Sequence, residues 1–212
     1  MADHSGAVLN PSADALHVGG TAFAAFEIAS IARGIFVLDQ MAKRAETTIV
    51  AARTVTPGKY FIVISGHLGE IEEACSAAHD AMHEDHIDNV IIRDPHPHLR
   101  DTLSCELEPI FQEALAIFEL QTLCSCLLAL DRTLKETSVQ IVELRLGAGL
   151  SGKGVFTVSG ALHMVEAACE VVEASVAANK IIRIEKISQI HEDLPKHLLG
   201  AEWPSVRGTK PS

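Results

Sequence analysis

The chain has 212 residues, of which 48% are apolar and only 21% are charged, so it can bury a core in one large domain or two small ones. Its formal net charge of -11 disfavours nucleic acid and anionic membranes as partners, because phosphate groups normally require a concentrated basic patch. The longest apolar runs, such as 60–64, are too short for a membrane-spanning helix, and residues 1–20 lack the features of an export signal. We therefore expect a protein of the cytosol.

In chain order, the first half of the sequence predicts a strand, a helix, a hairpin, a second helix and a final strand. Apolar residues at helical spacing, such as Ile35, Leu38 and Met41, indicate the first helix. A β-branched run over 47–55 meets a Thr-Pro-Gly turn and continues beyond it, which is typical of a hairpin. The expected ranges are strand 24–31, helix 34–45, strands 47–55 and 59–65, helix 68–83 and strand 89–93.

The second half predicts the same order of elements. The expected ranges are strand 116–123, helix 127–136, a hairpin turn at 149–152, helix 162–176 and strand 180–185. Each half has the order βαββαβ, so the fold class is α+β, a tandem pair of ferredoxin-like domains with two helices on one face of an antiparallel sheet. A sheet covered on one face only leaves the other face for a partner.

An internal duplication supports this repeated order. The matched segments are 26–28 with 118–120 at a spacing of 92, 65–66 with 159–160 at 94, and 91–93 with 181–183 at 90. The change from 92 to 94 requires a two-residue insertion between Val50 and Ser151. Packed elements keep their spacing while loops vary in length, so we expect two versions of one domain.

The domain boundaries follow from the ends of the repeats. We predict a first domain over 21–96 and a second over 113–200. A connector over 97–112 joins them, and tails over 1–20 and 201–212 flank them, because these segments concentrate Pro, Gly and Ser.

At this point the repeated motifs resemble a known family, the bacterial microcompartment shell domains. Glu27, with Lys43 sixteen residues later, resembles the start of such a domain, and Glu119 with Lys135 repeats the pattern. The hairpin turns resemble the family's Gly-Ser-Gly pore loop, and 91–96 is similar to the Pro-Arg-Pro-His ending of single-domain shell tiles. The resemblance covers about residues 24–200, and both halves follow the unpermuted order.

The resemblance implies roles for particular residues. The residues that match pore-loop positions are Thr56, Pro57, Gly58, Leu150, Ser151 and Gly152. Those that match tile-edge contacts are Lys43, Lys135 and Arg93. The second half lacks the Pro-Arg-Pro-His ending, which implies that alternate edges of the tile bind differently. Pro57 and Leu150 bring no polar side chain, which implies a constriction narrower or less polar than a serine-lined one.

Each motif also has an ordinary structural explanation. A Pro-Gly pair usually forms a simple turn, and a lysine four residues after an aspartate usually forms a solvated ion pair. Cys124 and Cys126 could indicate a metal or iron–sulfur site, since some tandem tiles hold a cluster with a pore-loop cysteine. Neither predicted loop contains cysteine, so we expect buried, reduced thiols and no metal or other cofactor.

The resemblance implies a structural shell protein of a bacterial microcompartment rather than an enzyme. It implies a homotrimer whose six domains imitate a hexameric tile with a central pore for small metabolites. The implied partners are other shell proteins, hexameric and pentameric tiles, and the implied location is the bacterial cytoplasm. Two trimers stacked face to face are a further possibility, and the alternative class is a soluble small-molecule sensor or enzyme on a tandem ferredoxin-like fold.

Overall fold

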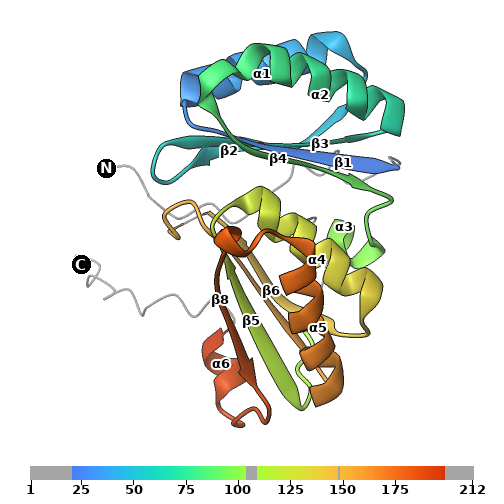
Figure 1. The fold of residues 1–212 in the computed structure, drawn as a ribbon, viewed down its shortest axis with the longest axis vertical. Helices are drawn as coiled ribbons and strands as arrows, with labels where there is room; N and C mark the ends of the chain where they lie inside the picture. Colours follow the sequence, from blue (N-terminus) through green and yellow to red (C-terminus); the bar gives the residue numbers. More distant parts are fainter. Residues whose placement is uncertain (1–20, 104–108, 148, 199–212) are drawn as a thin grey trace, which may run out of the picture.

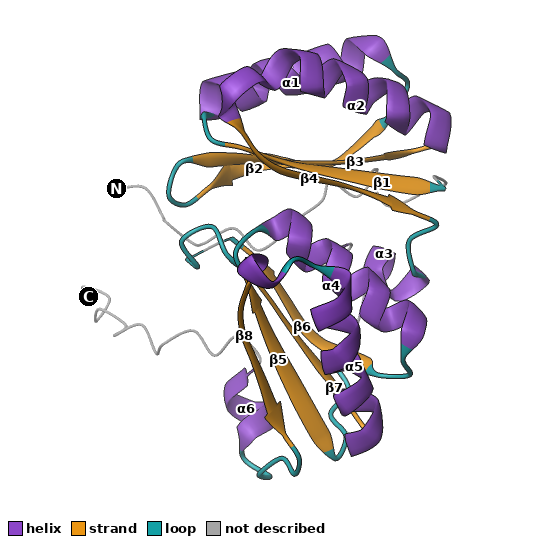
Figure 2. Cartoon of the chain, viewed as in Figure 1, coloured by secondary structure: helices purple, strands orange, loops and turns teal. Residues whose placement is uncertain are grey.

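The computed structural model describes residues 21–103, 109–147 and 149–198 and contains two α+β domains (Figures 1 and 2). The first domain comprises β1 (Ala22–Ile28), α1 (Ile31–Arg44), β2 (Thr48–Val55), β3 (Lys59–Gly66), α2 (Leu68–Met82), the 3-10 turn η2 (His83–Asp85) and β4 (His86–Arg93). The second comprises β5 (Ala114–Leu120), α4 (Leu123–Glu136), β6 (Gln140–Leu146), β7 (Gly154–Gly160), α5 (Leu162–Ser175), the 3-10 turn η3 (Ala178–Lys180) and β8 (Ile181–Ile187). The predicted βαββαβ order is confirmed in both halves.

Each domain is built on a four-stranded antiparallel sheet. The strand order is β2-β3-β1-β4 in the first sheet and β6-β7-β5-β8 in the second. The pairing of the first strand with the last shifts register at the same place in both, after Glu27 and after Glu119. The duplication therefore extends to the irregularities of the sheets, which confirms two versions of one domain.

The strand pairing corrects one predicted equivalence. Glu27 pairs with Asp88 in the first sheet, and its counterpart Glu119 pairs with Arg183 in the second, so Asp88 and Arg183 are equivalent at a spacing of 95. The predicted match of 91–93 with 181–183 at a spacing of 90 is wrong. Both segments have the sequence Ile-Ile-Arg, but a short apolar run can match at several offsets, whereas hydrogen bonding fixes one register.

Both N-terminal helices begin earlier than the sequence predicts. Ser30 and Thr122 are N-caps, whose side-chain oxygens accept hydrogen bonds from the backbone N–H of Arg33 and Ser125. The caps end the preceding strands about three residues before the predicted ends. As a consequence, the CxC pair of the second half lies in the first turns of α4 and not ahead of the helix.

Helix α4 packs against the first domain (Figure 1). It lies across the face of the first sheet that α1 and α2 leave uncovered. Phe23 and Phe61 from that face and Phe118 and Phe156 of the second domain belong to one continuous hydrophobic core, while a separate core lies under α1 and α2. We call this contact of α4 with β1 and β4 the domain seam.

Two short helices lie where the sequence predicts no element. α3 (Pro97–Leu103) falls in the predicted connector and α6 (Leu194–Leu198) near the end of the described chain. Leu99 and Leu103 are buried in the core of the domain seam, and the Arg100 guanidinium stacks over the Phe23 ring at 5.7 Å from its centroid. Proline at the first helical position was the available signal for α3. None of the described helices is both long and apolar enough to cross a membrane.

In both domains the first helix packs closely against its sheet, but the glycine that permits this approach lies on a different element in each domain. Gly34 of α1 faces Tyr60 of β3, and a Cβ at Gly34 would lie 2.3 Å from the Tyr60 Cβ. At the equivalent positions, Cys126 of α4 faces Gly154 of β7, and a Cβ on the glycine would lie 2.4 Å from the Cys126 Cβ. The small residue is on the helix in one domain and on the strand in the other, so both helices approach their sheets closely.

Candidate functional site

The two predicted pore loops lie side by side. The β2–β3 loop contains Thr56, Pro57 and Gly58, all exposed, and the β6–β7 loop contains Leu150, Ser151 and Gly152. A Cβ at Gly152 would lie 2.9 Å from the Thr56 carbonyl oxygen, so the loops are in direct contact. Both loops lie on the same side of the molecule in Figure 1.

Positive backbone φ angles explain why these two turns contain several glycines. Gly58 has φ +121°, and Gly149 and Gly152 have φ +68° and +78°. Ser151 is the exception, a non-glycine residue at φ +52° in the second turn. Glycine adopts such angles without steric cost, so the loops turn tightly and present backbone groups as well as the exposed Ser151 side chain.

A lysine anchors each loop to the first strand of its own domain. Lys59 Nζ lies 3.2 Å from Glu27 Oε2, and Lys153 Nζ lies 2.8 Å from Glu119 Oε1. Lys59 Nζ also lies 3.5 Å from the carbonyl oxygen of Gly152 in the other loop. The repeated Lys–Glu pair therefore fixes the loop positions relative to the sheets.

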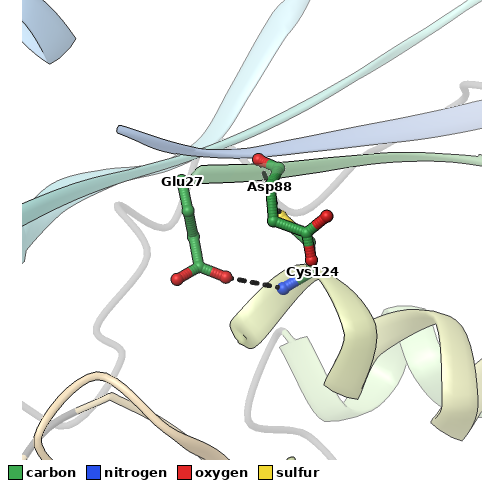
Figure 3. Close-up of side chains that lie close together, drawn as sticks. All are labelled: Glu27, Asp88 and Cys124. Carbon is green, nitrogen blue, oxygen red and sulfur yellow. Dashed lines mark hydrogen bonds between the residues drawn. The ribbon is translucent and has the colours of Figure 1, made fainter. Parts of the chain in front are cut away.

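Glu27 joins this pair to the domain seam. Its side chain is fully buried, and its Oε1 accepts hydrogen bonds from the backbone N–H groups of Leu123 and Cys124 at the start of α4. Figure 3 shows the bond from Cys124. Burial raises the pKa of Glu27, although these N–H groups and Lys59 act in the opposite direction. A carboxylate at the positive end of α4 compensates groups that the helix itself leaves unpaired.

Asp88 of β4 forms the second polar contact of the seam. Its carboxylate accepts hydrogen bonds from Thr122 Oγ1 and Ser125 Oγ, and Lys180 Nζ lies 2.6 Å from Oδ1. Burial alone would raise the pKa of Asp88, but these hydrogen bonds, with Lys180 foremost, hold it below its usual value. Asp88 thus links β4 of the first domain to α4 and η3 of the second.

Cys124 lies between the two carboxylates, and the three side chains bring one possible metal-ligand atom each to within 4.8 Å of one another (Figure 3). The two carboxylates already accept hydrogen bonds and are balanced by Lys59 and Lys180. Burial raises the pKa of the Cys124 thiol well above its usual range, so it stays protonated and lies 3.6 Å from the Asp88 carbonyl oxygen. These hydrogen bonds and ion pairs of Glu27 and Asp88 hold α4 against the first sheet, and we call them the polar lock of the domain seam. The predicted burial of Cys124 and Cys126 is confirmed.

The structure brings together two of the three predicted edge residues. Lys135 Nζ donates a hydrogen bond to the Arg93 carbonyl oxygen at 3.1 Å and pairs with the nearly buried Asp131 at 2.6 Å. Lys43 lies apart on α1, where its side chain is 69% exposed and pairs with Asp39. The two lysines are equivalent in the repeat, but only Lys135 lies at the domain seam.

Asp88, Lys180 and Thr122 were not singled out by the sequence analysis. The predicted strand begins at 89, one residue after Asp88, and the incorrect spacing of 90 does not match Asp88 with Arg183. An acidic residue just ahead of an apolar strand run was the available signal, but its partners come from a distant part of the chain.

Comparison with known proteins agrees with this geometry. The BMC domain family model matches residues 22–95 and 114–190. The chain is 24% identical to the bacterial microcompartment shell protein PduT of Citrobacter freundii over 174 residues, which cover 82% of this chain and 95% of that protein.

Solved structures support the same architecture. A microcompartment protein from Desulfitobacterium hafniense superposes with a TM-score of 0.73 at 28% identity and covers 82% of this chain and 98% of its own. The fused permuted hexameric shell protein MSM0275 of the RMM microcompartment has a TM-score of 0.56 at 18% identity, over 79% of this chain and 92% of its own, and supports the fold alone.

The fold and these matches define a tandem pair of BMC domains, and the chain belongs to the BMC domain family. It is a bacterial microcompartment shell protein, similar to PduT, and its role is structural rather than enzymatic.

Proposed function

We propose that the chain is a facet tile in which three copies form a ring of six domains around a central pore. The observation that carries this proposal is a mismatch between two equivalent helices. Ile31 and Ile35 of α1 are 37% and 54% exposed, whereas the equivalent Leu123 and Leu127 of α4 are 0% and 2% exposed. α4 buries these positions in the domain seam, so α1 has an apolar stripe of the kind that a seam covers.

The second sheet offers the complementary surface. Its face away from α4 and α5 is equivalent to the face of the first sheet that receives α4. Glu119, the counterpart of the helix-capping Glu27, keeps a 33% exposed side chain on this face. Placed against α1 of another copy, Glu119 would accept hydrogen bonds from the free N–H groups at the start of that helix, as Glu27 does for α4.

Such a contact is heterologous, because each copy contributes a different surface to each neighbour. Repetition of a heterologous contact closes into a ring when the rotation permits. A ring of three copies gives six domains related by alternating domain seams and new subunit contacts. We call each new contact of α1 with the second sheet of a neighbouring copy the subunit seam.

The adjacent hairpin loops support a pore. Because the loops of both domains touch within one chain, a closed ring would bring six loops around its axis. Backbone amides and Ser151 at the opening would favour small polar or anionic metabolites. The exposed Lys43 and the edge pair of Lys135 and Arg93 would contact neighbouring tiles, including other hexameric and pentameric shell proteins.

Electron microscopy of the purified protein tests the tile directly. We expect hexagonal outlines and extended sheets, and dispersed particles without such outlines would contradict the facet tile. Transport tests the pore: shells carrying Ser151→Leu should pass less of a small anion than wild-type shells, with Ser175→Leu on α5 as a control away from the loops. Equal flux through both would contradict the role of Ser151.

A further inference from the structure

The subunit seam, which rests on the proposed ring, differs from the domain seam in one charged pair. Asp88 at the domain seam has Arg183 as its counterpart in the second sheet, since they pair with the equivalent residues Glu27 and Glu119. Lys180 has Asp85 as its counterpart, because each ends the 3-10 turn before the last strand. The equivalence is exact in hydrogen bonding: the Asp85 carbonyl accepts from Ala29 N–H and the Lys180 carbonyl from Gln121 N–H.

The signs of both partners are inverted. At the domain seam, an acidic sheet residue faces a basic residue of the adjoining domain, Asp88 with Lys180 at 2.6 Å. At the subunit seam, a basic sheet residue, Arg183, would face the acidic Asp85 of the next copy. Arg183 is 70% exposed and Asp85 29% exposed in the single chain, so both side chains are accessible for this contact.

We propose that Arg183 and Asp85 form an intermolecular ion pair that makes the second sheet accept only α1 of another copy. Within a folded chain, α4 and the first sheet already cover each other, so two wrong pairings compete only between copies whose domain seam is open, as in a domain-swapped pair. The first sheet against another copy's α1 would place Asp88 opposite Asp85, and the second sheet against another copy's α4 would place Arg183 opposite Lys180. Like charges oppose both pairings, and opposite charges favour the alternating order of domains.

Neighbouring charges complete the contact. Arg33 of α1 lies 3.6 Å from Asp85, and Glu185 of β8 lies 3.7 Å from Arg183. Arg33 is the counterpart of Ser125, whose Oγ lies 3.0 Å from Asp88, so Arg33 would also come close to Arg183. Asp85 and Glu185 would then offset these two basic groups, which leaves the contact with two acidic and two basic side chains.

Charge reversal tests the proposal on the full-length chain. Arg183→Glu and Asp85→Lys should each raise the concentration at which the assembly dissociates by at least about tenfold, because like charges then meet at every subunit seam. The double variant Asp85→Lys with Arg183→Glu restores opposite charges and should return the dissociation to within about threefold of wild type. Analytical ultracentrifugation over a dilution series provides the measurement.

Two further samples sharpen the result. Lys186→Glu makes the same change of net charge on the same strand, but Lys186 pairs with Glu166 of its own domain at 2.6 Å, so this control should assemble as wild type does. An equal mixture of the Arg183→Glu and Asp85→Lys chains should assemble more tightly than either alone, because a mixed ring of three has a single like-charge seam.

The outcomes separate the two proposals. A wild-type chain that does not assemble would contradict the ring and the ion pair together. An assembled wild type whose Arg183→Glu variant dissociates no more readily than Lys186→Glu, or whose double variant fails to recover, would leave the ring intact and overturn the ion pair. Circular dichroism of each variant confirms that its domains remain folded.

Discussion

Helices α1 and α4 occupy the same place in two versions of one domain, yet they have different environments. α4 buries its apolar stripe and its N-terminus in the domain seam, where Glu27 caps it. α1 also begins at a hydroxyl N-cap, Ser30, and has a similar stripe, but Ile35 remains 54% exposed. Duplication has thus left one apolar stripe covered within the chain and the equivalent stripe exposed, where we propose that another copy covers it.

Substitution of equivalent apolar residues on α4 and α1 should give the largest effect and the clearest difference between the two helices. Leu127→Asp would bury an unpaired charge in the domain seam and should cost more than about 4 kcal/mol of folding free energy. Ile35→Asp, at the equivalent exposed position, should leave the chain folded but prevent assembly. Chemical denaturation and ultracentrifugation check both, and an unfolded Ile35→Asp chain would contradict the assigned surface.

The polar lock of the domain seam should be weaker in acid. Asp88→Asn should cost about 3 kcal/mol at pH 7, since Lys180 loses its charged partner. The folded-state pKa of Asp88 is lowered, so its contribution is fully present above the ordinary value of 3.8 and is lost as the pH falls through the lowered value. The stability difference between wild type and Asp88→Asn should therefore shrink in acid, as measured by urea denaturation at several pH values.

A matched variant controls for general acid effects. Asp193→Asn, in the turn just before α6, removes a carboxylate that is 56% exposed and pairs with Lys196 at 2.7 Å. Its cost should be about 0–1 kcal/mol at pH 7. A difference for Asp88→Asn that stays constant from neutral pH to strong acid would show that the charge of Asp88 does not stabilise the seam.

The glycine contact of α1 should give an intermediate effect. Gly34→Ala places a Cβ 2.3 Å from the Tyr60 Cβ, and the resulting overpacking should cost about 1–3 kcal/mol. Gly69→Ala in α2 has no atom within 4 Å of the new Cβ and should stabilise the helix by about 0.5–1 kcal/mol. Thermal denaturation of both variants makes the comparison, and equal melting temperatures would contradict the close approach of α1 to its sheet.

The edge lysines should give the smallest effects on folding. Lys43→Ala removes an exposed ion pair and should change stability by less than about 0.5 kcal/mol. Lys135→Ala should cost about 1–2 kcal/mol, because Asp131, with a side chain only 2% exposed, loses its cationic partner and keeps the hydrogen bond from the His96 backbone N–H. If Lys43 contacts a neighbouring tile, Lys43→Ala should still reduce sheet formation seen by electron microscopy.

The element order, the two repeats and the hairpin loops could be predicted from sequence, because each depends on local spacing and on matched positions. The domain seam could not, since it joins Glu27 and Asp88 to partners more than 30 residues away in the chain. α3 was missed because two buried leucines in a Pro-containing segment indicate burial only when the surface they cover is known. The predicted alignment of β8 with β4 was wrong for another reason. Identical Ile-Ile-Arg triplets occupy different positions in the two sheets, so sequence identity alone does not fix which residues are equivalent.

The mass of the purified protein in solution, measured by light scattering, tests the central claim most directly. The account predicts three times the 22.7 kDa of the single chain, or six times if two rings stack. A chain that stays monomeric at high concentration would show that α1 and the second sheet do not meet between copies, and it would contradict the proposed tile.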